Sequence, residues 1–122
     1  MPDTYVKHIE NIPYELLQDY REAHGSYDNR HYKSCEMMCR NILQGIAVDK
    51  GAEAGKFFVF YINYLVSKGY VAPRMQSSVD LIRSRANETI HENVTVSEDR
   101  AKETLMLTSM LLRIIYEFIE AN

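Results

Sequence analysis

The sequence predicts an all-α fold, a compact bundle of about five helices. Apolar residues recur at three- and four-residue spacing along most of the 122-residue chain. Residues 57–66 form an aromatic and β-branched run that could be a buried strand, but no second run exists to pair with it. Glycine, proline and helix-capping residues separate the apolar stretches. These three observations favour helices throughout.

Length and composition indicate one soluble domain. The chain is 46% hydrophobic with a net charge of −3, which argues against the broad basic field of a protein that holds nucleic acid by charge alone. We expect a polar lead over residues 1–11 and a single helical domain over residues 12–122. The N-terminus has no apolar signal region and no apolar run could span a bilayer, so we expect a cytoplasmic protein without a membrane partner.

The first two helices are expected over residues 13–24 and 29–50. Pro13 suits the first position of a helix, and residues 25–29 contain turn-forming and capping residues. Gly51 is a plausible stop for the second helix. The apolar positions of these two helices follow helical spacing and should be buried: Leu16, Leu17, Tyr20 and Ala23 in the first, and Tyr32, Cys35, Met38, Cys39, Ile42, Leu43 and Ile46 in the second.

His31, Cys35 and Cys39 lie four residues apart on the second helix, in a line that resembles metal ligands. A structural zinc site has four protein ligands, and the sequence contains no second Cys/His cluster to complete one. We therefore expect free cysteines packed in the core, with no metal and no cofactor.

The third helix is expected between the two glycines of residues 55–69, and the fourth from Pro73 to His91. The last helix should begin at Ser97, an N-cap residue followed by two acidic residues that suit the helix dipole. Apolar residues cover most of the circumference of this last helix. Such a helix is either central to its own bundle or the shared seam of a homodimer, and the residues leave both interpretations open.

The candidate site lies on the fourth helix, where polar side chains recur one turn apart. At 100° per residue, Val79, Ile82, Ala86 and Ile90 form a core-facing stripe. Arg83, Asn87 and His91 form a second stripe beside it. Polar groups at the edge of an apolar seam are partly shielded from water, which strengthens their hydrogen bonds.

Several segments resemble the family catalogued as domain of unknown function 4145. They are I-P-Y-E-L-L-Q-D-Y-R-E-A, M-M-C-R-N-I-L-Q, Y-L-V-S-K-G-Y-V-A-P, I-R-S-R-A-N-E-T-I-H and S-E-D-R-A-K-E-T-L, and the likeness runs from about residue 12 to the C-terminus. The family's Arg, Gly-Asn and His pattern here reads Arg83, Ala86-Asn87 and His91. Its Arg followed four residues later by an acid here reads Arg40 and Gln44.

This resemblance implies the HEPN superfamily, which contains dimeric helical domains of bacterial defence and toxin systems. Many of its members are metal-independent ribonucleases in which Arg, Asn and His meet at the dimer cleft. The sequence departs from the catalytic pattern at Ala86, where those members have Arg, and at Gln44, where the family has an acid. The resemblance therefore favours a dimeric binding or regulatory module, associated with nucleic acid or with a defence system.

Three interpretations of the stripe remain open. As an endoribonuclease, His91 would move a proton, Arg83 or Arg85 would hold the phosphate and Asn87 would orient the scissile group. As a binding module, two chains would present the same residues, with Arg85 and Arg40 as binding residues, to RNA, another nucleic acid or an acidic protein segment. As plain structure, Arg83 would pair with Asp80 or Glu88, and Arg40 with Glu36.

Overall fold

The computed structural model describes residues 8–91 and 94–119, with the side chains of residues 86–91 and 119 outside that description. The elements follow in the order α1 (Tyr14–Asp28), α2 (Tyr32–Asp49), α3 (Phe58–Ser67), a short 3-10 turn η2 (Pro73–Met75), α4 (Gln76–His91), α5 (Glu98–Leu112) and a π-helical segment η3 (Arg113–Ile119). The described residues contain no strand, so the all-α prediction is confirmed.

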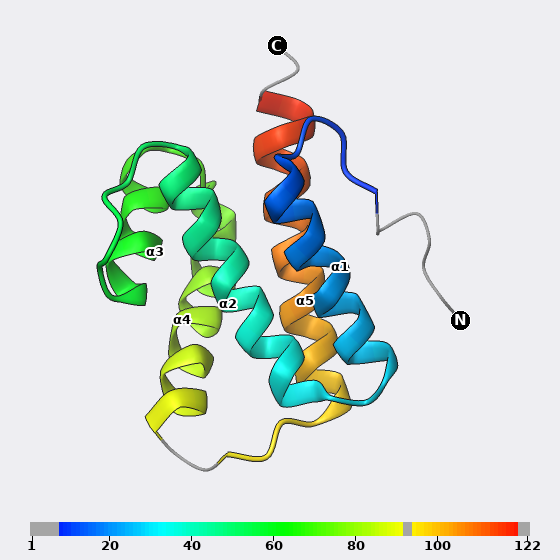
Figure 1. Ribbon diagram of the computed structural model, residues 1–122. Helices are drawn as coiled ribbons and strands as arrows, with labels where there is room; N and C mark the ends of the chain where they lie inside the picture. Colours follow the sequence, from blue (N-terminus) through cyan, green and yellow to red (C-terminus); the bar gives the residue numbers. More distant parts are fainter. Residues whose placement is uncertain (1–7, 92–93, 120–122) are drawn as a thin grey trace.

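Helix α2 is the centre of the bundle. It packs against α1 and α5 on one side and against α3 and α4 on the other (Figure 1). Five of the positions that the helical spacing predicted to be buried are fully buried: Cys35, Cys39, Ile42, Leu43 and Ile46. Tyr32 and Met38, which were also predicted to be buried, are only partly buried and pack at the edge of the core. Burial of large apolar side chains at this density is the main stabilising contribution to such a fold.

Helix α1 is longer than the sequence pattern predicted. It continues through Gly25 and ends at Asp28, four residues beyond the predicted end at His24. Both the backbone N–H and the side-chain amide of Asn29 donate to the Gly25 carbonyl, at 3.0 and 2.8 Å, and so satisfy the helix end. The chain then turns at Arg30, which has a φ of 64°. Helix α2 consequently begins at Tyr32 rather than at residue 29.

Two glycines have positional roles on α2. A Cβ atom at Gly45 would lie 2.6 Å from the Cδ2 atom of Leu16, so the absence of a side chain there permits close approach of α1. Gly51 has a φ of 113°, a conformation that L-residues with a side chain rarely adopt, and it follows the end of α2 as predicted.

The aromatic run of residues 57–66 forms α3, which confirms the helical interpretation. Its inner face is buried through Phe58, Tyr61, Ile62 and Leu65. Its outer side leaves large apolar groups in solvent, with Phe57 at 88% exposure. None of the described helices combines the length and the apolar character needed to cross a membrane.

The last helix begins as predicted, because the Ser97 hydroxyl accepts a hydrogen bond from the Arg100 backbone N–H at 3.2 Å. Its C-terminal end continues into η3, against which the residues before α1 pack. The Asn11 amide donates to the Tyr116 carbonyl at 3.3 Å, and Ile9 is 2% exposed. Residues 1–7 lie outside the described residues, and the predicted division between lead and domain at residue 11 stays a prediction.

Candidate functional site

The predicted polar stripe lies on α4, as its spacing required. Val79 and Ile82, which were expected to face the core, are 3% and 2% exposed. Asn87 and His91 belong to the helix, but their side chains lie outside the described residues. The arginines Arg83 and Arg85 are therefore the members of this stripe whose contacts define the site.

Arg83 reaches α3. Its guanidinium donates to the Asn63 Oδ1 atom at 3.0 Å, and its Nη1 atom lies 3.2 Å from an oxygen of Asp80. The pairing with Asp80 is one that the sequence had suggested. The Nε atom of Arg83 is buried without a hydrogen-bond partner among the described residues. This side chain is thus held between α4 and α3, with one carboxylate balancing its charge.

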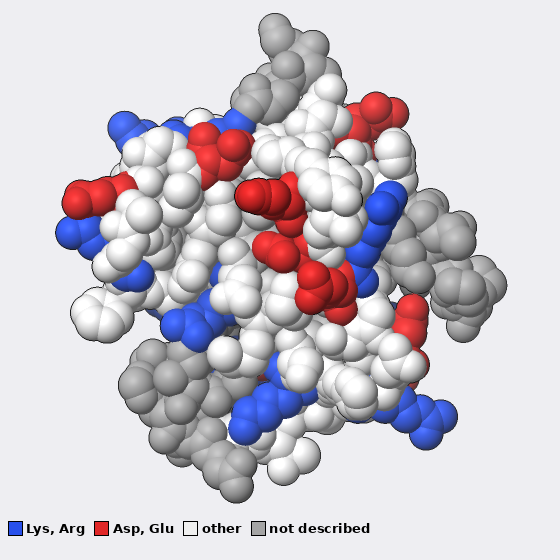
Figure 2. Space-filling model, viewed as in Figure 1, with Lys and Arg blue, Asp and Glu red and all other residues white. Residues whose placement is uncertain are grey.

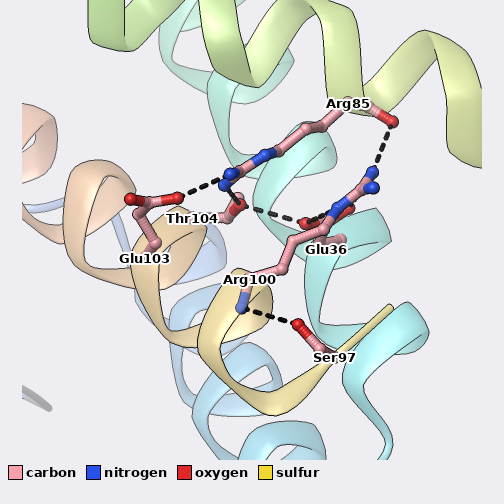
Figure 3. Close-up of polar contacts among 6 residues, drawn as sticks. All are labelled: Glu36, Arg85, Ser97, Arg100, Glu103 and Thr104. Atoms are coloured by element: carbon pink, nitrogen blue, oxygen red, sulfur yellow. Dashed lines mark hydrogen bonds and ion pairs between the residues drawn. The ribbon is translucent and has the colours of Figure 1, made fainter. Parts of the chain in front are cut away.

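Arg85 points the opposite way, toward α5 (Figure 3). Its Nη2 atom lies 2.6 Å from the Glu103 carboxylate and its Nη1 atom donates to the Thr104 hydroxyl at 3.4 Å. Two residues along a helix are separated by about 200°, which is why consecutive arginines of this R-S-R segment reach different neighbours. The structure therefore does not bring Arg83 and Arg85 to one point.

A buried ionic network adjoins Arg85, and sequence reasoning missed it. Glu36 of α2 is 5% exposed, and its carboxylate accepts hydrogen bonds from the Arg100 guanidinium at 2.9 and 3.2 Å. It also accepts one from the Thr104 hydroxyl at 3.1 Å. Arg100 in turn donates to the Arg85 carbonyl at 3.3 Å, which joins α4 to α2 and α5 (Figure 3).

One signal in the sequence could have pointed to this network. Glu36 directly follows the core residue Cys35 and lies on the same side of α2 as Cys39 and Leu43. A carboxylate at the edge of a buried stripe must be paired or hydrogen-bonded. The partner, Arg100, lies 64 residues away in sequence, so the pattern alone does not identify it.

Arg40 does not form the ion pair that one interpretation of the sequence assigned to it, because Arg100 and Thr104 hold the Glu36 carboxylate. The guanidinium of Arg40 instead lies over the ring of Phe58 on α3, 5.4 Å from its centroid. Its Nε atom is buried without a hydrogen-bond partner among the described residues. Burial lowers the pKa of the Arg40 guanidinium from its ordinary value, and an arginine of this kind is still a cation at neutral pH.

The cysteines lie in the core, as expected. Cys35 and Cys39 are both fully buried and free, whereas His31 is exposed and precedes the first turn of α2. A hydrogen bond with Cys35, together with burial, raises the pKa of the Cys39 thiol well above its usual value. Within the described residues, no three His, Cys, Asp or Glu side chains gather in a way that could hold a metal ion.

Four arginines near α4 thus form two separate groups. Arg40 and Arg83 contact α3 from α2 and α4 respectively, and each has a buried Nε atom without a partner. Arg85 and Arg100 belong to the network on the other flank of α4, where carboxylates already bind them. In the first group, Asp80 balances the charge of Arg83, and Arg40 has no carboxylate partner among the described residues.

Comparison with known proteins gives one match. The family model described as Domain of unknown function (DUF4145) matches residues 21–121. No curated protein and no solved structure matches the chain. Because the family model covers most of the sequence, the chain belongs to the DUF4145 family, a domain of unknown function.

Proposed function

We propose that the protein is a non-catalytic, homodimeric binding module of the cytoplasm that holds anionic groups of its partners. The observation that supports it most is that Arg40 and Arg83 both contact α3, Arg40 on its inner side and Arg83 on its outward side. Their guanidinium groups contact Phe58 and Asn63 of that helix. Arg40 is a cation at neutral pH without a carboxylate partner among the described residues, so its charge could balance an anionic group of a partner.

The alternative, a metal-independent endoribonuclease, requires an arginine, Asn87 and His91 to meet at one cleft. Arg85, one of the two candidate arginines, is bound by Glu103 and Thr104 and faces α5. Arg83 is engaged by Asp80 and Asn63 on the opposite flank. The proposal therefore keeps the binding role of Arg40 and Arg83 and leaves out the cleavage chemistry. The nucleic-acid and bacterial-defence setting that the family resemblance implies remains part of it.

Incubation with single-stranded RNA in EDTA tests the absence of cleavage. We expect the RNA to remain intact after long incubation with the wild-type protein and equally with His91→Ala, as followed by gel electrophoresis. Cutting by the wild type that is lost in His91→Ala would overturn the proposal, because a histidine that moves a proton is the expected centre of the nuclease.

The dimer is proposed to form through the outward flank of α5. Leu107 and Met110 lie on the same side of α5 as Glu103, at 100° per residue, and Glu103 faces Arg85 of α4. Met110 is 47% exposed, and the neighbouring Met106 is 60% exposed. Met106 and Met110 follow the exposed Lys102 and Glu103 along α5, and large exposed methionines are common on surfaces that another chain covers.

Sedimentation equilibrium checks this dimer. The double variant Met106→Lys/Met110→Lys should weaken self-association about tenfold or more, because two-fold symmetry places each substitution in the interface twice. Val48→Lys is the matched control: Val48 is 42% exposed on the far side of α2 and should leave self-association unchanged. A monomeric wild type, or equal weakening by the control, would contradict the proposed interface.

A further inference from the structure

The outward surface of α3 carries exposed apolar groups that nothing in the chain covers among the described residues. We call it the α3 face, defined by Phe57, Val59, Phe60 and Asn63. Phe57 is 88% exposed, Val59 47% and Phe60 39%. Exposed phenylalanine in adjacent turns is uncommon on a monomer surface, and such groups usually mark a contact with a partner.

Cationic side chains surround this face. Lys56 Nζ lies over the Phe60 ring at 5.8 Å from its centroid, and Lys68 Nζ lies over the Tyr64 ring at 5.6 Å. Arg83 donates to Asn63, and Arg40 lies over Phe58 at the inner edge of α3. Glu53 lies 3.8 Å from Lys56 and Asp80 lies 3.2 Å from Arg83, so two carboxylates offset two of these four cations. The rim of the apolar face therefore retains a smaller positive excess.

The segment around α3 has more basic than acidic residues, whereas the rest of the chain has more acidic than basic residues. Residues 50–85 contain six Lys and Arg and two Asp and Glu, whereas the remaining residues contain eight and fifteen. In Figure 2, blue side chains lie around α3 on the left with red ones among them, and further red side chains follow α1. The chain is thus acidic overall with a local excess of basic residues in the segment that contains α3, which favours an anionic partner there.

We propose that the α3 face binds a short segment of a partner protein in which acidic and large apolar side chains alternate. The inference rests on the proposed binding function and names its partner. The apolar side chains of the segment pack on Phe57, Val59 and Phe60. Its carboxylates contact the Lys56, Lys68 and Arg83 side chains at the rim.

Three features favour a peptide over the other anionic partners. Helix α3 has ten residues and is about 15 Å long, which suits a few residues of an extended segment rather than a long tract of phosphates. The exposed side chain of Val59 is aliphatic, and nucleobases stack on aromatic side chains rather than on aliphatic ones. The acidic remainder of the surface repels a long polyanion or an anionic bilayer more strongly than it repels a short peptide.

Fluorescence anisotropy with the full chain tests this inference. The probe is a fluorescein-labelled decapeptide of alternating aspartate and leucine. We expect saturable binding that weakens as salt increases. Phe57→Ser and Lys68→Glu should each weaken the binding about tenfold or more. Both side chains are exposed, so the fold should tolerate the changes.

The matched controls are Tyr14→Ser and Lys33→Glu. Tyr14 is 71% exposed on α1 and Lys33 is exposed at the start of α2, so neither contributes to the α3 face. Both controls should bind the peptide as the wild type does. Absence of peptide binding, or binding that survives Phe57→Ser, would overturn the inference.

Two further probes decide the class of partner. Labelled oligothymidylate and vesicles of phosphatidylcholine with phosphatidylserine should bind the wild type more weakly than the peptide does. Tighter binding of either probe, lost in Phe57→Ser, would overturn the peptide assignment in favour of nucleic acid or a lipid surface. If the protein leaves RNA intact but does not bind the peptide, this inference alone is refuted. If the protein cleaves RNA and His91→Ala abolishes the cleavage, the proposed function is refuted.

Discussion

Glu36→Ala should lower the free energy of unfolding by about 3–5 kcal/mol, because it leaves the Arg100 guanidinium without its buried counter-ion. The Glu36 side chain is 3% exposed and that of Arg100 is 17% exposed, so water replaces the lost contacts poorly. The Thr104 hydroxyl would lose its acceptor as well. Urea denaturation followed by circular dichroism measures the change.

Two control variants distinguish the contribution of the Glu36–Arg100 ion pair from that of the neighbouring groups. Glu103→Ala removes the partly exposed carboxylate that binds Arg85 and should change the unfolding free energy by about 1 kcal/mol or less. Glu36→Met combined with Arg100→Met removes both charges and should be less destabilising than Glu36→Ala. A double variant that is less stable than the single one would show that the network does not act as a buried ion pair.

Tyr116→Ala should lower the free energy of unfolding by about 3–5 kcal/mol through the cavity it leaves. The Tyr116 side chain is 1% exposed, and its hydroxyl donates to Asp49 at 2.7 Å across to the end of α2. Lys50 Nζ also lies 4.7 Å from the centroid of its ring. The same urea titration provides the measurement.

Tyr116→Phe retains the ring and removes the hydroxyl alone. We expect a loss of about 1–3 kcal/mol, since the hydrogen bond is to a carboxylate. Burial and the hydrogen bond to Asp49 raise the pKa of Tyr116 above its usual value, so the hydroxyl remains a donor at neutral pH. A Phe variant as unstable as the Ala variant would contradict the assignment of most of the effect to packing.

The fold was largely predictable because its core follows a local periodicity. The apolar spacing of α2 identified Cys35, Ile42 and Ile46 as buried, and the structure confirms them. The end of α1 was not predictable from the same rule. Glycine commonly follows the last residue of a helix, which is why the sequence predicted an end before Gly25. Here capping by Asn29 and tertiary packing allow the helix to continue past Gly25 to Asp28.

The site was predictable only in part. Helical spacing correctly placed Arg83 and Asn87 on one helix beside a buried stripe, and it separated Arg85 from them. It could not reveal that Arg83 would reach Asn63 or that Arg85 would reach Glu103, because those contacts depend on how α4 packs against α3 and α5. The roles of Asn87 and His91 stay predictions.

A titration of isotope-labelled protein with the aspartate and leucine decapeptide, followed by backbone amide NMR, tests the central claim most directly. The account predicts that chemical shift changes concentrate at residues 56–68, with Arg83 of α4 and Arg40 of α2 also affected. Amides near Glu103 and Glu36, on the other flank of α4, should remain unchanged. Changes that centre on the Arg85 and Glu103 flank, or no changes at saturating peptide, would contradict a binding module organised around α3.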